Sequence, residues 1–247
     1  TAVFRRDSRN EERGEWRVAP KMPSRWQVGF DYRKMHLRMR LALTSFKHVG
    51  LFPEQAENWK FIYDRCEDMV ARGKRPRVLN LFAYTGGATV ACLDAGAQVC
   101  HVDAAKGMVQ WAKENAAASG LSAKPIRWIV DDCAKFVERE IRRGKQYDAI
   151  IMDPPSYGRG PTGEVWKLEE NLYPFVELVS GVLSDNPLFV IMNTYTTGLA
   201  PSAVTYIMET VISKKFGGHT ESQELGLPVT ETGLALPCGV TTRWTAK

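Results

Sequence analysis

Two short segments carry the residue types best suited to chemistry, and each follows a run of apolar residues. The first is Asn80-Leu81-Phe82-Ala83-Tyr84-Thr85-Gly86-Gly87, and the second, about seventy residues later, is Asp153-Pro154-Pro155-Ser156-Tyr157. Glycines in a turn after a strand let the backbone approach a ligand closely. A proline-stiffened turn after a later strand can hold a carboxylate in place. The pair predicts a cofactor at the first turn and a target atom at the second.

The second turn suits an amine as the reacting group. Asp153 and the carbonyls of Pro154 and Pro155 are acceptors that can orient a nitrogen lone pair and take up its proton. Transfer of an activated group then needs little beyond positioning. Tyr157 can stack on an unpaired base. We therefore predict Asp153, Pro154, Pro155 and Tyr157 as the catalytic set, against the plainer reading of a rigid turn that ends a buried strand.

Carboxylates end two further predicted strands. Asp103, 23 residues after Asn80, precedes Ala104 and has two acceptor oxygens that match the vicinal hydroxyls of a ribose. Asp132 and Cys133 follow the next strand, where a carboxylate and a backbone N–H can read adenine; a helix N-cap explains Asp132 equally well in isolation. The chain has no G-x-G-x-x-G motif, which counts against a pyrophosphate-bearing cofactor.

Cationic and aromatic residues surround these turns. Residues 158–167 are glycine-rich and are predicted to form a mobile loop at the mouth of the site. We expect substrate contacts from this region and from two arginines on the outer face of a predicted strand over residues 37–43. The predicted substrate-binding residues are Ser156, Arg159, Trp166, Lys167, Arg38 and Arg40.

Charge is placed unevenly along the 247 residues. Residues 1–50 carry twelve Lys or Arg and five Asp or Glu, a net charge of +7, whereas the remaining 197 residues carry 21 and 23, a net charge of −2. A basic arm on a near-neutral body favours a polyanionic partner; the alternative is a solvated leader that binds nothing.

The composition limits location and metal content. No apolar run reaches the roughly 18 residues that span a bilayer. The five cysteines form no C-x-x-C pair and no zinc-spaced cluster, so they are predicted to be buried thiols in a reducing cytoplasm. We expect no metal and no membrane partner, and the sequence carries no signal for oligomeric state. It begins at Thr1 rather than Met, which leaves residues upstream as an open expectation.

Strands and helices alternate from residue 77 onward. This order predicts a doubly wound, mostly parallel α/β sheet of the class I methyltransferase type, closed by a C-terminal antiparallel hairpin. We expect residues 1–50 to be a basic extension with short β-strands, of which 1–25 are flexible or edge-forming, and residues 51–247 to be the catalytic domain. The expected strands are 26–28, 37–43, 78–82, 98–102, 126–130, 149–152, 188–193, 220–227 and 234–244, and the expected helices are 55–71, 88–95, 107–119, 133–143, 168–183 and 203–215.

Taken together, these motifs resemble the class I S-adenosylmethionine-dependent RNA methyltransferases, and within them the bacterial ribosomal-RNA large-subunit methyltransferase-like family. The likeness runs from about residue 45 to the C-terminus and includes Gly50 to Trp59, similar to that family's G-x-F-x-x-Q-x-x-N segment. It implies S-adenosylmethionine as cofactor and RNA as partner, with Phe52 and Gln55 closing over the cofactor. The implied cofactor-binding residues are Phe52, Gln55, Asn80, Phe82, Ala83, Tyr84, Gly86, Asp103, Ala104, Asp132, Cys133 and Asp153.

Two departures from the family shape the expected reaction. The short basic lead cannot be the β-barrel RNA-binding domain of some relatives. The segment after the fifth strand, Asn193-Thr194-Tyr195-Thr196-Thr197, lacks the cysteine nucleophile that attack through cytosine C5 requires, so a base nitrogen is favoured. The alternatives are methylation of DNA, protein or a small molecule, a nicotinamide-dependent oxidoreductase, and a non-catalytic scaffold that binds S-adenosylmethionine or RNA.

Overall fold

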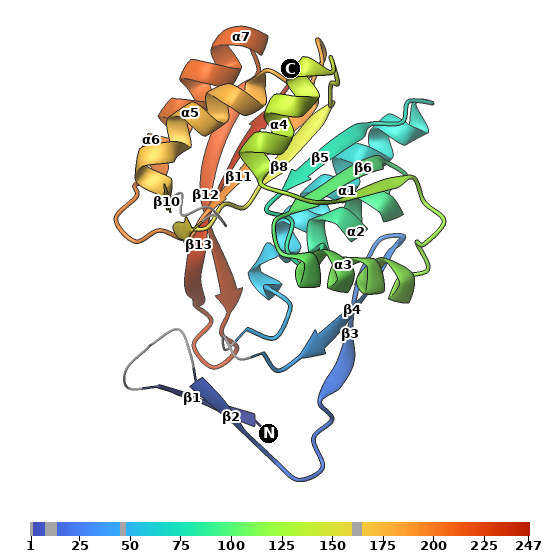
Figure 1. Cartoon of the computed structure of the whole chain (residues 1–247), viewed down its shortest axis with the longest axis vertical. Helices are drawn as coiled ribbons and strands as arrows, with labels where there is room; N and C mark the ends of the chain where they lie inside the picture. The colour runs from blue at the N-terminus through green and yellow to red at the C-terminus, as the bar shows by residue number, and fades with distance from the viewer. Residues whose placement is uncertain (1, 8–13, 45–47, 160–164) are drawn as a thin grey trace.

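A seven-stranded sheet forms the centre of the molecule (Figure 1). The structure is a computed structural model and describes residues 2–7, 14–44, 48–159 and 165–247. The strand order is β12-β13-β11-β8-β5-β6-β7. The bounds are β5 Arg77–Leu81, β6 Gln98–Asp103, β7 Ile126–Val130, β8 Ala149–Met152, β11 Phe189–Thr194, β12 His219–Pro228 and β13 Ala235–Thr245.

Five of these strands are parallel, and the C-terminal hairpin closes the sheet. β13 lies antiparallel to both β11 and β12, so the predicted antiparallel hairpin is confirmed. The chain builds outward from β5 through β6 to β7 and then returns to place β8 on the other side of β5. This reversal of strand order lies at the carboxyl ends of β5 and β8, where ligands bind in doubly wound folds.

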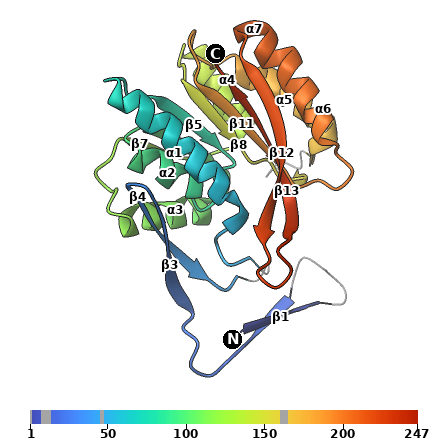
Figure 2. The ribbon, with the colours of Figure 1, turned by 180° about the vertical axis from the view of Figure 1, so that it is seen from behind.

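Helices cover both faces of the sheet (Figures 1 and 2). One layer contains α1, α2 and α3, and the other contains α4, α5 and α6. The bounds are α1 Ala56–Ala71, α2 Gly87–Asp94, α3 Lys106–Ala118, α4 Cys133–Arg142, α5 Leu168–Ser180 and α6 Pro201–Met208. A 3₁₀ turn, η1 (Pro53–Gln55), precedes α1, while a π-helical turn, η2 (Glu209–Ser213), and α7 (Lys214–Phe216) extend α6.

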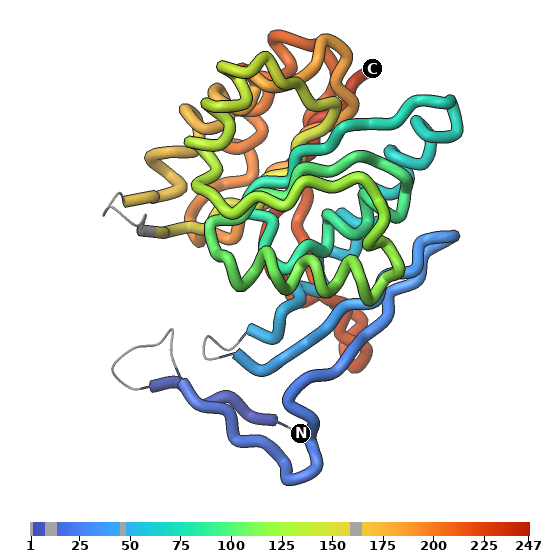
Figure 3. The backbone as a smooth tube through the Cα atoms, turned by 45° about the vertical axis from the view of Figure 1, so that its right-hand side comes forward, coloured from blue at the N-terminus to red at the C-terminus, as the bar shows by residue number. Residues whose placement is uncertain are grey.

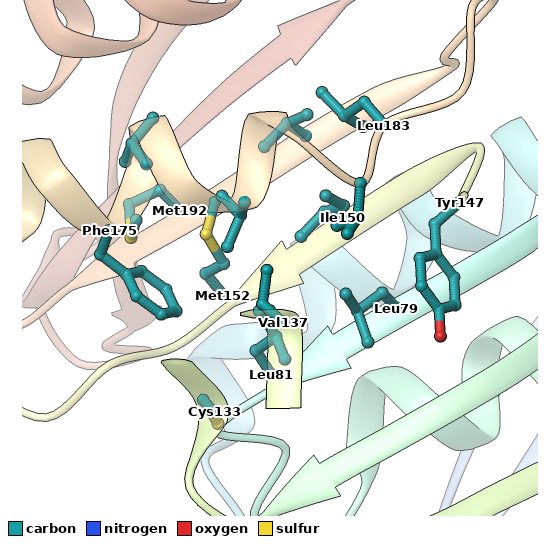
Figure 4. Packing of buried hydrophobic residues seen from close by; sticks show 14 of the residues in the cluster. Leu79, Leu81, Cys133, Val137, Tyr147, Ile150, Met152, Phe175, Leu183 and Met192 are labelled. Atoms are coloured by element: carbon teal, nitrogen blue, oxygen red, sulfur yellow. The ribbon is translucent and has the colours of Figure 1, made fainter. Parts of the chain in front are cut away.

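Alternating side chains along each strand feed the two cores. Leu79 and Leu81 of β5 point into the cluster with α4 and α5, whereas Val78 packs toward α1 and α2. Figure 4 shows the first cluster, with Ile150 and Met152 from the neighbouring strand. Strands buried on both faces explain the near-continuous apolar runs by which the sequence predicted them.

Two antiparallel strand pairs lie in the described part of residues 1–50 (Figure 3). β3 (Arg25–Tyr32) pairs with β4 (Met35–Ala42), whose Met35, Leu37 and Met39 are buried in the core beside α1. The flexible or edge-forming lead expected over residues 1–25 is corrected in part, because β1 (Ala2–Arg6) pairs antiparallel with β2 (Gly14–Val18).

The segment after the Asp-Pro-Pro turn was predicted to be a loop, but its described residues include two short strands. β9 (Tyr157–Arg159) pairs antiparallel with β10 (Val165–Lys167), which leads directly into α5. Residues 160–164 lie outside the described part of the chain. The three-residue strands are too short to show a periodicity that sequence reasoning could detect.

Candidate active site

A cleft opens beyond the carboxyl ends of β5 and β8, at the reversal of strand order. Its empty volume is about 450 Å³, part of which is open to solvent. Side chains from η1, β5, β8 and β11 meet there although they are far apart in sequence. The lining residues are Leu51, Phe52, Gln55, Trp59, Asn80, Phe82, Ala83, Tyr84, Thr85, Gly86, Gly87, Ala88, Ile151, Asp153 and Asn193.

The turn after β5 has an unusual backbone. Phe82, Tyr84 and Gly86 have φ values of 54°, 49° and 83°, all in the left-handed region that non-glycine residues rarely adopt. Two side chains from outside the turn hold this shape. The Tyr84 N–H donates to Asp103 Oδ2, at the end of β6, at 2.8 Å, and the Phe82 N–H donates to Cys133 Sγ, at the start of α4, at 3.3 Å. A strained turn fixed from outside is typical of a functional site.

Asp103 and Cys133 therefore have a structural task that the sequence did not reveal. Asp103 also accepts from the Ala105 N–H at 2.8 Å, and burial raises its pKa. Burial likewise raises the pKa of Cys133, which keeps that thiol neutral. Ala104 is exposed, and Asp132 caps α4 by accepting from the Lys135 N–H at 2.9 Å. None of these four residues is among those lining the cleft, so their contacts with ribose and adenine stay predictions.

Asn80 is held by a buried polar relay. Its Nδ2 donates to Thr89 Oγ1 at 2.9 Å, and the same oxygen lies 2.9 Å from His101 Nδ1. Burial lowers the pKa of His101 to about 3, so the imidazole is neutral. Because Asn80 Nδ2 donates to Thr89, the side-chain oxygen of Asn80 is the acceptor that a ligand in the cleft can use.

Asp153 supplies a carboxyl group to the lining of the cleft. Its N–H donates to Leu81 O at 3.4 Å, which ties the end of β8 to β5. Burial, with a smaller contribution from the nearby Glu54 carboxylate, raises the pKa of Asp153 to about 7. A carboxyl group with a pKa near the operating pH can act as a proton acceptor.

The remaining residues of the Asp-Pro-Pro turn are partly engaged. The Pro155 carbonyl accepts from Trp166 Nε1 at 2.7 Å, so it already has a partner, in contrast to the expectation that both proline carbonyls face a substrate. Ser156 Oγ accepts from Thr196 Oγ1 at 2.7 Å, which joins this turn to the segment after β11. Tyr157 is 53% exposed, as a stacking residue needs to be.

The other predicted substrate residues lie outside the cleft. Trp166 packs its ring against Phe82 and Phe175, with centroids 5.7 and 5.5 Å away. Lys167 pairs with Glu170 at 2.7 Å, and the side chain of Arg159 lies outside the described residues.

The two arginines of β4 have acidic partners. Arg38 pairs with Asp31 at 2.8 Å, and Arg40 pairs with Glu114 at 2.7 Å. A phosphate would have to compete with these carboxylates, so the role of the two arginines stays a prediction that this geometry does not favour.

The segment from Gly50 to Gln55 forms one wall of the cleft. The Phe52 ring lies 5.5 Å from that of Tyr84 and 6.4 Å from that of Tyr195. Thr85 Oγ1 donates to Gly50 O at 2.7 Å, which joins this wall to the turn after β5. Phe52 and Gln55 thus lie where closure over a cofactor, as predicted, requires them.

The sequence predicted no role for three polar residues near this wall, Asn58, Asn193 and Tyr195. Asn58 is buried and donates to Gln55 Oε1 at 2.8 Å and to Asn193 Oδ1 at 2.9 Å. Gln55 Nε2 in turn donates to Tyr195 Oη at 2.6 Å. The asparagine of the G-x-F-x-x-Q-x-x-N segment and the polar run after β11 were the available signals, but their pairing requires the fold.

The strand order, the flanking helices and the cleft at the β5/β8 reversal define a class I methyltransferase fold. The sequence profile of the S-adenosylmethionine-dependent methyltransferase family matches residues 3–179. The chain belongs to this family.

Individual relatives support this membership. The crystal structure of the SAM-dependent methyltransferase from Agrobacterium tumefaciens is 35% identical with a TM-score of 0.88, covering 100% of this chain and 77% of that one. Ribosomal RNA large subunit methyltransferase K/L of Shewanella frigidimarina is 32% identical over 148 residues, which are 59% of this chain and 19% of the relative. The same-named protein of Pseudoalteromonas atlantica is 37% identical over 121 residues, 49% of this chain and 16% of the relative. The chain thus matches about a fifth of the length of these curated relatives.

The cleft fits the cofactor of this family. Its lining combines aromatic rings with a small number of placed polar groups, among them the Asn80 amide and the Asp153 carboxyl group. An acidic group beside the cleft suits a cofactor that carries a positively charged sulfonium.

Among the described residues, no group of acidic, histidine or cysteine side chains is arranged to hold a metal ion. No helix in the described ranges is long and apolar enough to cross a membrane.

Proposed function

We propose that this methyltransferase acts on RNA, that its substrate is ribosomal RNA, and that the methyl group goes to a base nitrogen. The observation that carries the choice of nitrogen is the Asp153 carboxyl group, which lines the cleft and has its pKa raised to about 7. A carboxylate so placed accepts a hydrogen bond from an amino group of a base and holds the nitrogen lone pair toward the cleft. It then takes the proton that the nitrogen loses.

The bound cofactor supplies a methyl group on sulfur that is already activated for transfer. The protein has to orient the acceptor, keep water out and remove a proton. Pro154 and Pro155 keep Asp153 in place through their fixed φ angles. None of the described residues lining the cleft is a cysteine, and the segment after β11 presents Asn193 and Tyr195 instead. Covalent addition to cytosine C5 needs a thiolate there, so this lining supports a nitrogen target.

The choice of RNA rests on charge and on relatives. The first fifty residues carry a net charge of +7, and β1 and β2 present Arg5, Arg6 and Arg17 as exposed residues. The curated relatives at 32% and 37% identity bear the name of large-subunit ribosomal RNA methyltransferases. A ribosomal substrate also agrees with a cytoplasmic location and with the four buried free thiols.

The proposal is tested by transfer of tritiated methyl groups from S-adenosylmethionine to separate pools of ribosomal RNA, transfer RNA, DNA and protein. The pools come from cells that lack the gene, so that the target site is unmodified. We expect label in ribosomal RNA with the wild-type protein, at a rate about a hundredfold or more lower with Asp153→Asn. Label confined to DNA, protein or transfer RNA would contradict the proposed substrate.

A further inference from the structure

A row of hydrogen-bonded polar side chains, most of them buried, joins β13 through α1 and η1 to the segment after β11. Arg243 is only 8% exposed, and its Nε and Nη2 donate to Asn58 Oδ1 at 2.9 and 2.7 Å. Asn58 Nδ2 then donates to Gln55 Oε1 at 2.8 Å, and Gln55 Nε2 donates to Tyr195 Oη at 2.6 Å. Four side chains from three parts of the sequence form one continuous chain of hydrogen bonds.

The direction of this chain is fixed at its buried end. A guanidinium group has only donors, so Asn58 must turn its oxygen toward Arg243 and its amide N–H groups toward Gln55. Gln55 must then present its oxygen to Asn58 and its amide N–H to Tyr195. Reversing either amide would set donor against donor in a buried place, at a cost of about 1–3 kcal/mol.

Tyr195 Oη therefore accepts from Gln55, and its own proton has to point elsewhere. Among the described residues, the Tyr195 hydroxyl donates to no protein acceptor. Tyr195 comes directly after β11, which pairs in parallel with β8 so that Met192 lies opposite Met152. The segments that follow the two strands thus lie together, and Thr196 is bonded to Ser156 of the Asp-Pro-Pro turn at 2.7 Å. Burial and the nearby Asp153 carboxylate raise the pKa of Tyr195, so the phenol keeps its proton.

The ring of Tyr195 lies in a slot shaped for it. A Cβ atom at Gly239 of β13 would lie 2.6 Å from Tyr195 Cδ1 and 2.8 Å from Cε1, so only glycine leaves room for the ring. The ring centroid of Phe52, which lines the cleft, lies 6.4 Å from that of Tyr195. Position and proton direction are therefore both set before any substrate arrives.

We propose that Tyr195 is a specificity-determining residue that donates a hydrogen bond to an acceptor atom of the target base. Arg243, Asn58 and Gln55 are positioning residues that turn its proton toward the target. Together with Asp153, which accepts from an amino group, the site would read a base edge that has an acceptor beside an amine. This inference rests on the proposed methylation of a base nitrogen.

Tyr195→Phe tests the inference because it keeps the ring in its slot and removes only the hydroxyl. We expect kcat/KM for the nucleic-acid substrate to fall about ten- to a hundredfold, which is the usual effect of losing one hydrogen bond and leaving its partner unpaired. The affinity for S-adenosylmethionine should stay unchanged. The matched control is Tyr206→Phe on α6, where the side chain is 71% exposed and turnover should stay at the wild-type value.

Gln55→Glu tests the direction of the chain. A carboxylate at this position accepts from Tyr195 and turns the proton away from the target. Its loss in kcat/KM, corrected for any change in cofactor affinity, should match that of Tyr195→Phe. The double variant should lose no more than either single variant, because both remove the same donor.

A measurement without substrate accompanies these assays. In ¹⁵N NMR spectra, Tyr195→Phe should move one Gln55 Nε2 proton upfield and leave the Asn58 amide protons in place. Unmoved Gln55 signals, or a wild-type kcat/KM in Tyr195→Phe, would overturn the inference. If the wild-type protein methylates DNA or another class of substrate, the proposed function is wrong. The role of Tyr195 can still be tested then, by comparing kcat/KM of wild type and Tyr195→Phe on that substrate.

Discussion

At the scale of single residues, Asp153 links the shape of the cleft to its chemistry. Burial and the Glu54 carboxylate raise the pKa of Asp153 to about 7. The carboxylate form, which accepts the proton, therefore increases as pH rises through 7. We expect kcat/KM for S-adenosylmethionine to rise to a plateau above about pH 7, because this ratio reports the free enzyme.

The Asp153→Asn variant separates proton removal from cofactor binding. It should lower kcat by about a hundredfold or more, the usual size of a general-base contribution, and its pH profile should be flat. Titration calorimetry should still detect S-adenosylmethionine binding. Loss of cofactor binding with intact folding would show that Asp153 serves the cofactor rather than the transfer.

The same carboxyl group affects stability in the opposite sense. Its pKa is higher in the folded protein than the ordinary value of 3.8, so the folded state holds the proton more tightly. Stability is therefore lost as pH rises from about 4 to about 7. Without cofactor, Asp153→Asn should melt at a higher temperature than wild type at pH 8, and the difference should shrink toward pH 4. A difference that grew toward acid would contradict the raised pKa.

Residues that follow strands were the easiest to predict. Asn80, Asp103 and Asp153 each end or follow a strand, so a parallel sheet must bring them to one edge. Asn58 and Tyr195 were beyond reach, because their importance comes from hydrogen bonds that join residues 135 or more positions apart. Arg243 belongs to the same group, since the sequence gives no sign that this arginine is buried.

At the scale of elements, the turn between β5 and α2 carries the strain of the site. Gly86 has φ of 83°, and a Cβ there would lie 3.0 Å from Ala112 Cβ. The glycines of this turn were predicted to let a ligand approach, and the structure adds a requirement of helix packing. Helix packing also requires glycine at position 87, because an added Cβ there would lie 2.8 Å from the Trp59 ring.

Substituting Gly86 by Ala tests this account of the turn. The left-handed backbone alone costs about 1–2 kcal/mol for a residue with a Cβ, and the contact with Ala112 adds to it. Gly73→Ala is the matched control, since Gly73 has φ of 76° with nothing within 4 Å of the added atom. Urea unfolding should show the larger loss for Gly86→Ala, and only that variant should weaken S-adenosylmethionine binding. Equal losses of stability in Gly86→Ala and Gly73→Ala would show that the contact with Ala112 does not require a glycine at position 86.

The elements themselves were largely predictable from residue 77 onward. Strands buried on both faces leave apolar runs, and amphipathic helices separate them, so order and type could be inferred. The pairs β1–β2 and β9–β10 could not. β9 and β10 have only three residues each, and β1 and β2 have no buried residue, so neither pair leaves a buried apolar run in the sequence. β1–β2 is held by a tertiary contact instead, a hydrogen bond of 2.6 Å from Trp16 Nε1 to Thr44 O.

At the scale of the whole molecule, positive charge is concentrated in the N-terminal hairpins. RNA binding through such a region should weaken as salt rises, since each neutralised phosphate releases counterions. Changing Arg6 and Arg17, both exposed on β1 and β2, to Gln should lower the slope of log Kd against log salt by about one for each arginine that contacts a phosphate.

Arg72→Gln at the C-cap of α1, where Arg72 pairs with Asp68, serves as the control and should leave the slope unchanged. A slope that is equally unchanged in the β1–β2 variants would remove the N-terminal hairpin from the RNA-binding surface.

The most direct test of the account is the chemical identity of the methylated product. Ribosomal RNA from cells lacking the gene would be incubated with the protein and S-adenosylmethionine carrying a deuterated methyl group. The RNA would then be digested to nucleosides and examined by mass spectrometry. We predict a single nucleoside with the deuterated methyl group on a base nitrogen, formed at a rate about a hundredfold or more lower with Asp153→Asn. A deuterated 5-methylcytosine, a methylated ribose, or unlabelled ribosomal RNA beside labelled DNA or protein would contradict it.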